Sequence, residues 1–519
     1  MAYESAPVVE TTAGRVRGTM IEGVAAYKSV PYGATTAGAN RFMPPRKPEA
    51  WLGIREARTY CSRAPQAGLR GPTRPELANF SGATDSAPET EDCLTLNVWT
   101  PGAAGKRPVM VWLHGGAFSY GSANSDRQQG SRLCNRGDVV VVTVNHRLNI
   151  FAHLHLAELG GAEFARSSNA GVLDLVAALE WVRDNIAQFG GDPGNVTIFG
   201  ESGGGGKVST LMTMPMARGL FHKAIIQSGA SVILGRPERA AKLAELVLKE
   251  LGIAAADFRK LQSVPVAQLL AAVAPAQKVL GPVHRPLFDR YPFGPVVDGD
   301  VLPRDPFSPD ASPLSADIPL LIGDMKDEMT SFTATIDRIW DRTLTEAEAR
   351  DRLFPIAGRQ TDRVVETYRR LYPRANAARR FLAATTDSNF RVRSLAVAQR
   401  KAAQQQASVW MYSFEWETPL FDGRLGAPHA LDVPFTFDTI DLTNATDMSD
   451  GARKVAATMA ETWIAFARTG NPNNATIPHW PAYNAAERPT LLLDVEPGVV
   501  NDLRGEQRAL WQEITETTR

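Results

Sequence analysis

The stretch FGESGGGGKVS, residues 199–209, could either bind a phosphate or carry a nucleophile. It comes close to the phosphate-loop pattern G-x-x-x-x-G-K-[ST], and it also contains G-x-S-x-G centred on Ser202. Counted from Gly200, the Gly-Lys pair comes one residue too late for a phosphate loop. Val208 also stands where that loop needs a hydroxyl for Mg²⁺. The stretch therefore favours a serine nucleophile on a sharp turn between a strand and a helix.

A serine that transfers acyl groups needs hydrogen-bond donors for the oxyanion of its tetrahedral intermediate. The sequence HGGAF, residues 114–118, follows an apolar run, and its two glycines allow backbone N–H groups to face a substrate. We expect the donors to be the N–H groups of Gly116, Ala117 and Gly203, the last of which directly follows the serine.

The serine also needs a histidine as general base. The order serine, acid, histidine along the chain is that of α/β-hydrolases, so the base should lie far downstream. His429 is the expected base because it lies on a glycine-containing loop after the apolar run 408–417. His284 is the weaker alternative.

The carboxylate that orients the base is not determined by spacing alone. The segment IGDMKDEMTSF, residues 322–332, follows an apolar run and offers Asp324, Asp327 and Glu328. An exposed acidic loop without a catalytic role is the alternative interpretation of the same segment.

These candidates need a scaffold, and the chain alternates short apolar runs with segments of helical period. The expected strands are at residues 107–116, 138–147, 196–199, 318–324 and 408–417. Between two of them, residues 169–191 have the spacing of a helix, with Asn169 as its expected N-cap. This alternation predicts an α/β fold with a mainly parallel sheet and helices on both faces. Ligands bind at the carboxyl ends of such strands, and every candidate residue follows a strand.

One large domain, residues 1–519, fits the sequence better than several smaller ones. Length alone would suggest about two to four domains. However, no Gly/Ser linker, change of composition or internal repeat divides the chain. Ala-, Leu-, Arg- and Glu-rich stretches at about 230–300 and 330–410 are expected to be helical insertions over the sheet edge or the site.

Composition excludes several classes of partner. Lys plus Arg and Asp plus Glu each total 56, so no excess charge favours nucleic acid or an anionic membrane. The sequence contains no run of about 18 apolar residues, so we do not expect a membrane-spanning helix. The N-terminus lacks the apolar segment of a signal peptide, so we expect a cytoplasmic protein with reduced cysteines. The sequence does not indicate an oligomeric state.

Taken together, these residues resemble the type-B carboxylesterase family of α/β-hydrolases, which includes the cholinesterases and bacterial carboxylesterases. The resemblance spans almost the whole chain. Its motifs include EDCLTLNVWTP (91–101), FGGDPGNVTIFGESGG (189–204), FHKAIIQSG (221–229) and PVVDGDVLP (295–303). It implies an α/β-hydrolase fold and hydrolysis of small-molecule esters, without a metal or an organic cofactor.

Carried over by position, the resemblance implies Ser202 as nucleophile, Glu328 as the acid and His429 as the base. It also implies the oxyanion donors and two residues beside the triad that order the histidine and bound water. These are Gly116, Ala117 and Gly203, and then Glu201 and Ser228.

The chain departs from the family pattern at several positions. Gly203 stands where the family usually has Ala, although its N–H group remains available. HRLN…FAHL replaces the usual YRLG…GFL, which changes the surroundings of His146 and His153. Cys93 matches a disulfide position of secreted members, but the usual partner position lies nearer Ala64 than Cys61. The choline-binding tryptophan is missing between the two cysteines, so a choline ester is not the expected substrate.

The sequence thus predicts a serine hydrolase that cleaves carboxylic esters through an acyl-enzyme. An amidase or carbamate hydrolase that uses the same triad is the alternative within the same chemistry. A catalytically inactive adhesion or binding module is disfavoured, because all three triad residues stand in matching context.

Overall fold

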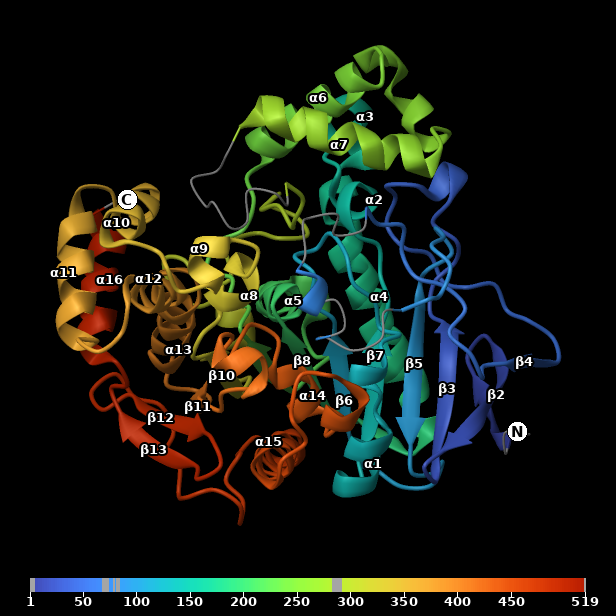
Figure 1. Ribbon diagram of the computed structural model, residues 1–519. Coiled ribbons are helices and arrows are strands. Elements are labelled where there is room, and N and C mark those ends of the chain that lie inside the picture. The colour runs from blue at the N-terminus through green and yellow to red at the C-terminus, as the bar shows by residue number, and fades with distance from the viewer. Residues whose placement is uncertain (1–4, 68–73, 78–79, 81–84, 282–291, 518–519) are drawn as a thin grey trace.

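The computed structural model describes residues 5–67, 74–77, 80, 85–281 and 292–517. His284, the alternative base, lies outside these described residues. The centre of the molecule is a twisted sheet of thirteen strands with helices packed around it (Figure 1).

The strands are ordered β1-β2-β3-β5-β7-β6-β8-β9-β10-β11-β12-β13, with β4 beside β2. Their bounds are β1 Ser5–Thr11, β2 Gly14–Ile21, β3 Val24–Pro31, β4 Ile54–Glu56, β5 Thr95–Thr100, β6 Arg107–Leu113, β7 Val140–Val144, β8 Gly191–Glu201, β9 Lys223–Gln227, β10 Leu320–Met325, β11 Val409–Phe414, β12 Pro489–Leu493 and β13 Gly498–Asn501. The pairs from β7 to β12 are parallel, whereas β1, β2, β3 and β5 form an antiparallel edge and β13 closes the other edge antiparallel. The predicted mainly parallel sheet is therefore confirmed.

The α-helices lie on both faces of the sheet and beyond its edges (Figure 1). Their bounds are α1 Ser131–Gly137, α2 Asn149–His153, α3 Ala157–Gly160, α4 Ala170–Asn185, α5 Gly203–Leu211, α6 Pro237–Glu250, α7 Val266–Leu280, α8 Met329–Thr333, α9 Asp337–Trp340, α10 Glu346–Ala357, α11 Thr361–Leu371, α12 Ala377–Thr386, α13 Val392–Ala402, α14 Asp432–Thr436, α15 Asp450–Thr469 and α16 Gly505–Thr517. A π-helical turn, η11 (Asp387–Arg391), joins α12 to α13.

Strand β6 shows how the central strands separate two cores. Val109 and Val111 pack in one hydrophobic cluster with α4 and α5, while Met110 and Trp112 pack in another with α1 and α15. Successive side chains of a strand point to opposite faces, so a strand buried on both faces must be apolar throughout. This explains why the central strands read as continuous apolar runs.

The helix expected over 169–191 is present, but its predicted cap is wrong. Helix α4 spans Ala170–Asn185 and continues as a 3-10 turn to Phe189. The Asn169 side chain makes no capping hydrogen bond. It donates instead to the Val296 carbonyl and to Asp298, both at 2.8 Å. The loop that contains Val296 and Asp298 therefore binds the side chain that the local sequence pattern predicted as the cap of the helix.

Two groups of helices extend beyond the sheet (Figure 1). Helices α6 and α7 pack on each other and on α2 through a separate apolar cluster. Helices α10, α11, α12 and α16 form a second cluster with its own core, in which Trp511 and Tyr368 are buried. Helix α13 follows this cluster in sequence and lies against the sheet. Turn η11 and helix α13 thus connect the second group of helices to the sheet.

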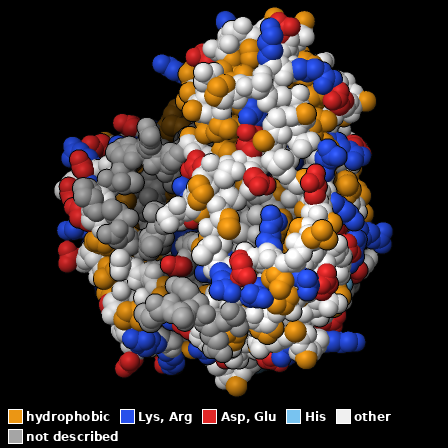
Figure 2. All heavy atoms as spheres, turned by 90° about the vertical axis from the view of Figure 1, so that its right-hand side faces the viewer, with side chains coloured by type: hydrophobic (Ala, Val, Ile, Leu, Met, Phe, Trp, Pro, Cys, Tyr) orange, Lys and Arg blue, Asp and Glu red, His pale blue; other side chains and the backbone are white. Residues whose placement is uncertain are grey.

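The surface and the cysteines add three observations. Figure 2 shows Lys and Arg side chains scattered among Asp and Glu on one face of the molecule. Within the described ranges, no helix is long and apolar enough to span a membrane. Cys61 is exposed, Cys93 and Cys134 are buried, and all three are free thiols.

Candidate active site

Ser202 lies on a sharp turn between strand β8 and helix α5. Its backbone has φ 55° and ψ −121°, a combination that L-residues rarely adopt. A Cβ atom on Gly200 would lie 2.6 Å from the Gly204 carbonyl carbon, and one on Gly204 would lie 2.0 Å from the Leu113 carbonyl oxygen. The glycines on either side of Ser202 therefore allow the strand and the helix to approach at backbone distance, as a nucleophile elbow requires.

The loop after β6 reaches the same place from the neighbouring strand. Gly116, Ala117 and Phe118 have successive positive φ values of 105°, 51° and 59°. A Cβ atom on Gly203 would lie only 2.5 Å from the Ala117 backbone nitrogen. The backbone at the start of α5 and the backbone of the loop thus meet beside Ser202.

His429 and Glu328 come together from the loops after β11 and β10. The His429 Nδ1 and Glu328 Oε2 atoms are 2.5 Å apart, and the other Glu328 oxygen accepts a hydrogen bond from the Met325 N–H at 2.9 Å. Glu328 is completely buried. Its carboxylate therefore contacts one imidazole nitrogen and leaves the other for a different partner.

The other imidazole nitrogen, His429 Nε2, lies 3.2 Å from Glu201 Oε1. Within the described residues no hydrogen bond joins the Ser202 hydroxyl to His429. The rings of Phe332 and Phe390 flank the imidazole, with centroids 4.8 and 5.0 Å away. Two aromatic contacts and the Glu328 carboxylate thus determine where the imidazole lies, beside the residue that precedes the serine.

The other two acids of the 322–332 segment have different partners. Asp324 is a residue of β10, and its carboxylate lies 3.3 Å from the guanidinium of Arg391 at the end of turn η11. The Asp327 carboxylate accepts a hydrogen bond from the Ala427 N–H at 3.1 Å. Among the three carboxylates that the sequence left open, Glu328 is the one in contact with His429.

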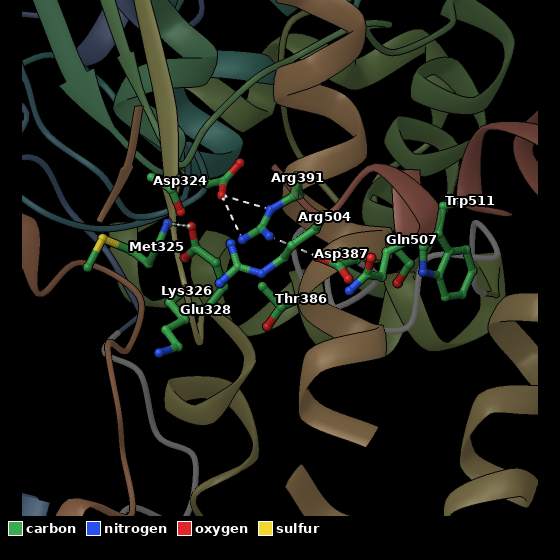
Figure 3. A network of polar contacts seen from close by, with 12 residues as sticks. Asp324, Met325, Lys326, Glu328, Thr386, Asp387, Arg391, Arg504, Gln507 and Trp511 are labelled. Carbon is green, nitrogen blue, oxygen red and sulfur yellow. Dashed lines mark hydrogen bonds and ion pairs between the residues drawn. The ribbon is translucent and has the colours of Figure 1, made fainter. Parts of the chain in front are cut away.

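A buried polar network behind Glu328 was not visible in the sequence (Figure 3). Arg391 lies between Asp324 and Asp387, at 3.3 and 3.4 Å. Asp387 also accepts a hydrogen bond from Tyr368, which in turn accepts one from the indole N–H of Trp511 in α16 at 2.9 Å. Because Asp387 and Arg391 are the ends of turn η11, this network holds in place the turn that carries the ring of Phe390.

Burial dominates the electrostatics of the site. It raises the pKa of Glu328 well above its usual value, against the opposing effects of the Met325 N–H group and the Arg391 charge. It raises the pKa of Glu201 to about 8, although the nearby His429 acts in the opposite direction. It also raises the pKa of Asp432 to about 6. Three carboxyl groups close to one imidazole are therefore all harder to ionise than in water.

Ser202 lines a cavity of about 190 Å³. The chain segments inserted after β9 and after β10 both contribute residues to its wall. Ala117, Gly203 and Ser228 line it beside the serine. The remaining lining residues that come from the segments after β9 and after β10 are Gly229, Ala230, Ser231, Phe293, Asn389, Phe390 and Arg393. A small-molecule substrate that enters this cavity would meet the serine hydroxyl at its base.

A serine on a strand–helix elbow at the carboxyl edge of a mainly parallel sheet is typical of the α/β-hydrolase fold, and the chain has this fold. The model of the Carboxylesterase family matches residues 5–511. The chain therefore belongs to the carboxylesterase family and is a carboxylic ester hydrolase, as the sequence motifs predicted.

Individual relatives agree with this assignment. The chain is 38% identical to the para-nitrobenzyl esterase of Bacillus subtilis (strain 168) over 96% of this chain and 97% of that protein. It is 32% identical to the phenmedipham hydrolase of Pseudarthrobacter oxydans over 94% and 95% of the two chains. The solved structure of the Geobacillus stearothermophilus carboxylesterase EST55 superimposes with a TM-score of 0.83 at 40% identity, covering 98% of this chain and 100% of that one.

Proposed function

We propose that the chain hydrolyses small-molecule carboxylic esters through an acyl-enzyme formed on Ser202, with His429 as general base and Glu328 as its orienting acid. The observation that carries the proposal is the 2.5 Å contact between His429 Nδ1 and Glu328, beside the Ser202 elbow. A carboxylate on Nδ1 holds the imidazole in the tautomer whose Nε2 is free to accept a proton.

In the first half of the reaction, His429 Nε2 takes the Ser202 proton while the serine oxygen attacks the ester carbonyl. The N–H groups of Gly116, Ala117 and Gly203 stabilise the negatively charged oxygen of the intermediate. His429 then gives the proton to the departing alcohol, and water repeats the sequence on the acyl-enzyme. In this structure Nε2 lies 3.2 Å from Glu201, and the proposed step requires Nε2 to accept the proton of the Ser202 hydroxyl once substrate is bound.

Glu201 and Ser228 complete the proposed site without touching the reacting bond. Glu201 contacts His429 Nε2, and Ser228 follows β9 and lines the same cavity as Ser202. In this proposal they order the imidazole and the water that attacks the acyl-enzyme. No metal or organic cofactor takes part in any of these steps.

The proposal treats residues 1–519 as one α/β-hydrolase domain with helical insertions at about 230–300 and 330–410, a division supported by the single continuous sheet. The cytoplasmic location expected from the sequence stays a prediction.

The decisive experiment replaces the nucleophile. Ser202→Ala should abolish turnover of p-nitrophenyl butyrate and labelling by a fluorophosphonate, whereas Ser263→Ala, at an exposed serine that does not line the cavity, should keep both. Wild-type activity in the Ser202 variant would overturn the assignment. A matched p-nitroanilide cleaved as fast as the ester would instead identify an amidase.

A further inference from the structure

Lys207 is a buried lysine in helix α5 that the proposed reaction does not use. Its side chain is completely buried. The Nζ atom donates a hydrogen bond to the His114 carbonyl at 2.7 Å and lies 5.6 Å from the centre of the Phe118 ring. Within the described part of the chain no carboxylate pairs with it. A buried ammonium without a counter-ion is costly, so its position calls for a reason other than stability.

Three histidines surround this lysine, from the segments after β6 and β7 and from α2. In each, Nδ1 faces a backbone carbonyl and must carry the hydrogen: His114 to Gly115 at 2.7 Å, His146 to Arg147 at 2.6 Å and His153 to Ser168 at 2.8 Å. The rings of His114 and His146 stack with centroids 4.9 Å apart.

These histidines carry no charge near neutral pH. Burial and the Lys207 charge lower the pKa of all three, that of His153 to about 4. Arg147, the other cation beside the cluster, is paired with Asp174 at 2.6 Å. Lys207 is therefore the unpaired charge of this cluster, and among the described residues it donates one hydrogen bond, to the carbonyl that begins the 114–118 loop.

Lys207 connects the two segments that supply the proposed oxyanion donors. Helix α5 begins with Gly203, and the loop contributes Gly116 and Ala117. The loop has three successive residues with positive φ, a conformation that persists only where the surroundings hold it. One hydrogen bond from the helix, with the ring contact to Phe118, attaches both ends of this strained stretch to α5.

We propose that Lys207 is a positioning residue of the ester hydrolysis. Its ammonium holds the 114–118 loop in register with the start of α5, so that the donors of both segments face the same oxygen. This inference rests on the proposed function of Ser202 and the oxyanion donors, and it adds a residue to which neither the family pattern nor the triad assigns a role.

The proposal predicts a pH dependence, because a charge-assisted hydrogen bond is about twice as strong as a neutral one. Burial lowers the pKa of Lys207 to about 7. The group is therefore protonated below neutral pH and loses its charge above it. The groups that face it, His114, His146 and His153, are neutral throughout this range. We expect kcat to decline on the alkaline side of neutrality as the loop is held less firmly.

The test compares Lys207→Met with Lys401→Met. Lys401, on α13, is an equally buried lysine whose Nζ donates to the Ala316 carbonyl at 2.8 Å, away from the cavity. Methionine matches the length of the side chain and removes the donor and charge in both variants. The readouts are kcat and KM for p-nitrophenyl butyrate from pH 6 to 9.5, and the inhibition constant of a trifluoromethyl ketone, whose adduct carries an oxyanion.

We expect Lys207→Met to lower kcat about 10- to 100-fold with little change in KM, less than the about 100- to 1,000-fold loss of an oxyanion donor itself. It should weaken the ketone by a similar factor and remove the alkaline decline. Lys401→Met should stay within about twofold of wild type and keep that decline. Wild-type kcat and ketone affinity in a folded Lys207→Met enzyme would overturn the proposal.

If Lys207→Met does not fold, the wild-type enzyme still provides a test. A kcat that stays flat from pH 7 to 9.5 would contradict the inference. A decline that both Lys401→Met and Glu201→Gln retain would support it, because the pKa of Glu201 is raised to about 8 and this group titrates in the same range. Ser202→Ala distinguishes failure of the proposed function from failure of the proposed role of Lys207. Loss of activity in Ser202→Ala, with normal kcat in Lys207→Met, would remove this inference and leave the proposed function intact.

Discussion

Gly203 and Ala117 meet backbone to backbone: a Cβ atom on Gly203 would lie 2.5 Å from the Ala117 nitrogen and 3.0 Å from its Cα. Gly203 therefore allows the start of α5 and the 114–118 loop to approach each other at backbone distance. The closeness brings together two of the three proposed oxyanion donors.

Gly203→Ala should therefore displace the loop and lower kcat. A contact of 2.5 Å forces a shift of the backbone, and small misplacements of catalytic groups cost up to about 100-fold in rate. We expect a loss of about 10- to 100-fold in kcat per active site, measured after titration with a fluorophosphonate.

Gly102→Ala is the matched control, because a Cβ atom there would meet no atom within 4 Å. It should leave kcat unchanged. An unaltered kcat in Gly203→Ala would show that the loop can retreat without losing its donors.

The choice of acid can be tested by comparing two neighbouring carboxylates. Glu328→Gln keeps the shape of the side chain but removes the charge that orients His429, and by analogy with serine proteases it should lower kcat by about 10⁴-fold. Asp327→Asn alters a carboxylate that accepts from the Ala427 N–H at 3.1 Å, and it should leave most of kcat. The reverse result in steady-state kinetics would assign the acid to Asp327.

Arg391 should affect both stability and the acid limb of the pH profile. Arg391→Met leaves Asp324 and Asp387 buried without their cation, which typically costs about 3–5 kcal/mol of unfolding free energy. Since the Arg391 charge lowers the pKa of Glu328, its loss raises that pKa further. Glu328 then takes up a proton at a higher pH, so the acid limb of kcat/KM should move upwards.

An exposed ion pair serves as the control for Arg391. Arg363 pairs with Glu513 at 2.6 Å on the surface, where water screens the two charges, and Arg363→Met should leave the unfolding free energy almost unchanged. It should not move the pH profile. An acid limb that stays in place in Arg391→Met would limit Arg391 to a role in stability.

Lys207 should also give the stability of the protein a characteristic pH dependence. Its pKa is lowered by burial from 10.5 to about 7 in the folded protein. The unfolded chain therefore binds more protons than the folded chain between these two pH values. The free-energy penalty of burying the lysine charge is complete below pH 7 and disappears as pH rises towards 10.5, so the unfolding free energy rises over this range. The penalty is about 1.4 kcal/mol for each unit of pKa shift.

Thermal unfolding of the wild type and of Lys207→Met between pH 7 and 10 checks whether the stability of the wild type rises with pH relative to that of the variant. The midpoint of the wild type should rise relative to that of the variant between pH 7 and 10. A constant difference between the two midpoints would mean that Lys207 titrates alike in the folded and unfolded chains.

Much of the fold was predictable because it depends on local patterns. The apolar runs at 107–116, 138–147 and 318–324 became β6, β7 and β10, since a strand buried on both faces must be apolar throughout. The elbow at Ser202 was readable for a similar reason: only glycines allow a strand and a helix to approach so closely. The cap of α4 could not be predicted, because a distant loop competed for Asn169.

The sequence by itself determined which residues stand at the carboxyl ends of parallel strands, and therefore that a serine, a histidine and an acidic segment share one edge of the sheet. Only the tertiary structure decided which acid meets His429. Asp324, Asp327 and Glu328 are neighbours in the chain, but at a strand end each points in a different direction. The contacts of Arg391 and Lys207 likewise join segments from distant parts of the chain, and local pattern carries no information about such pairs.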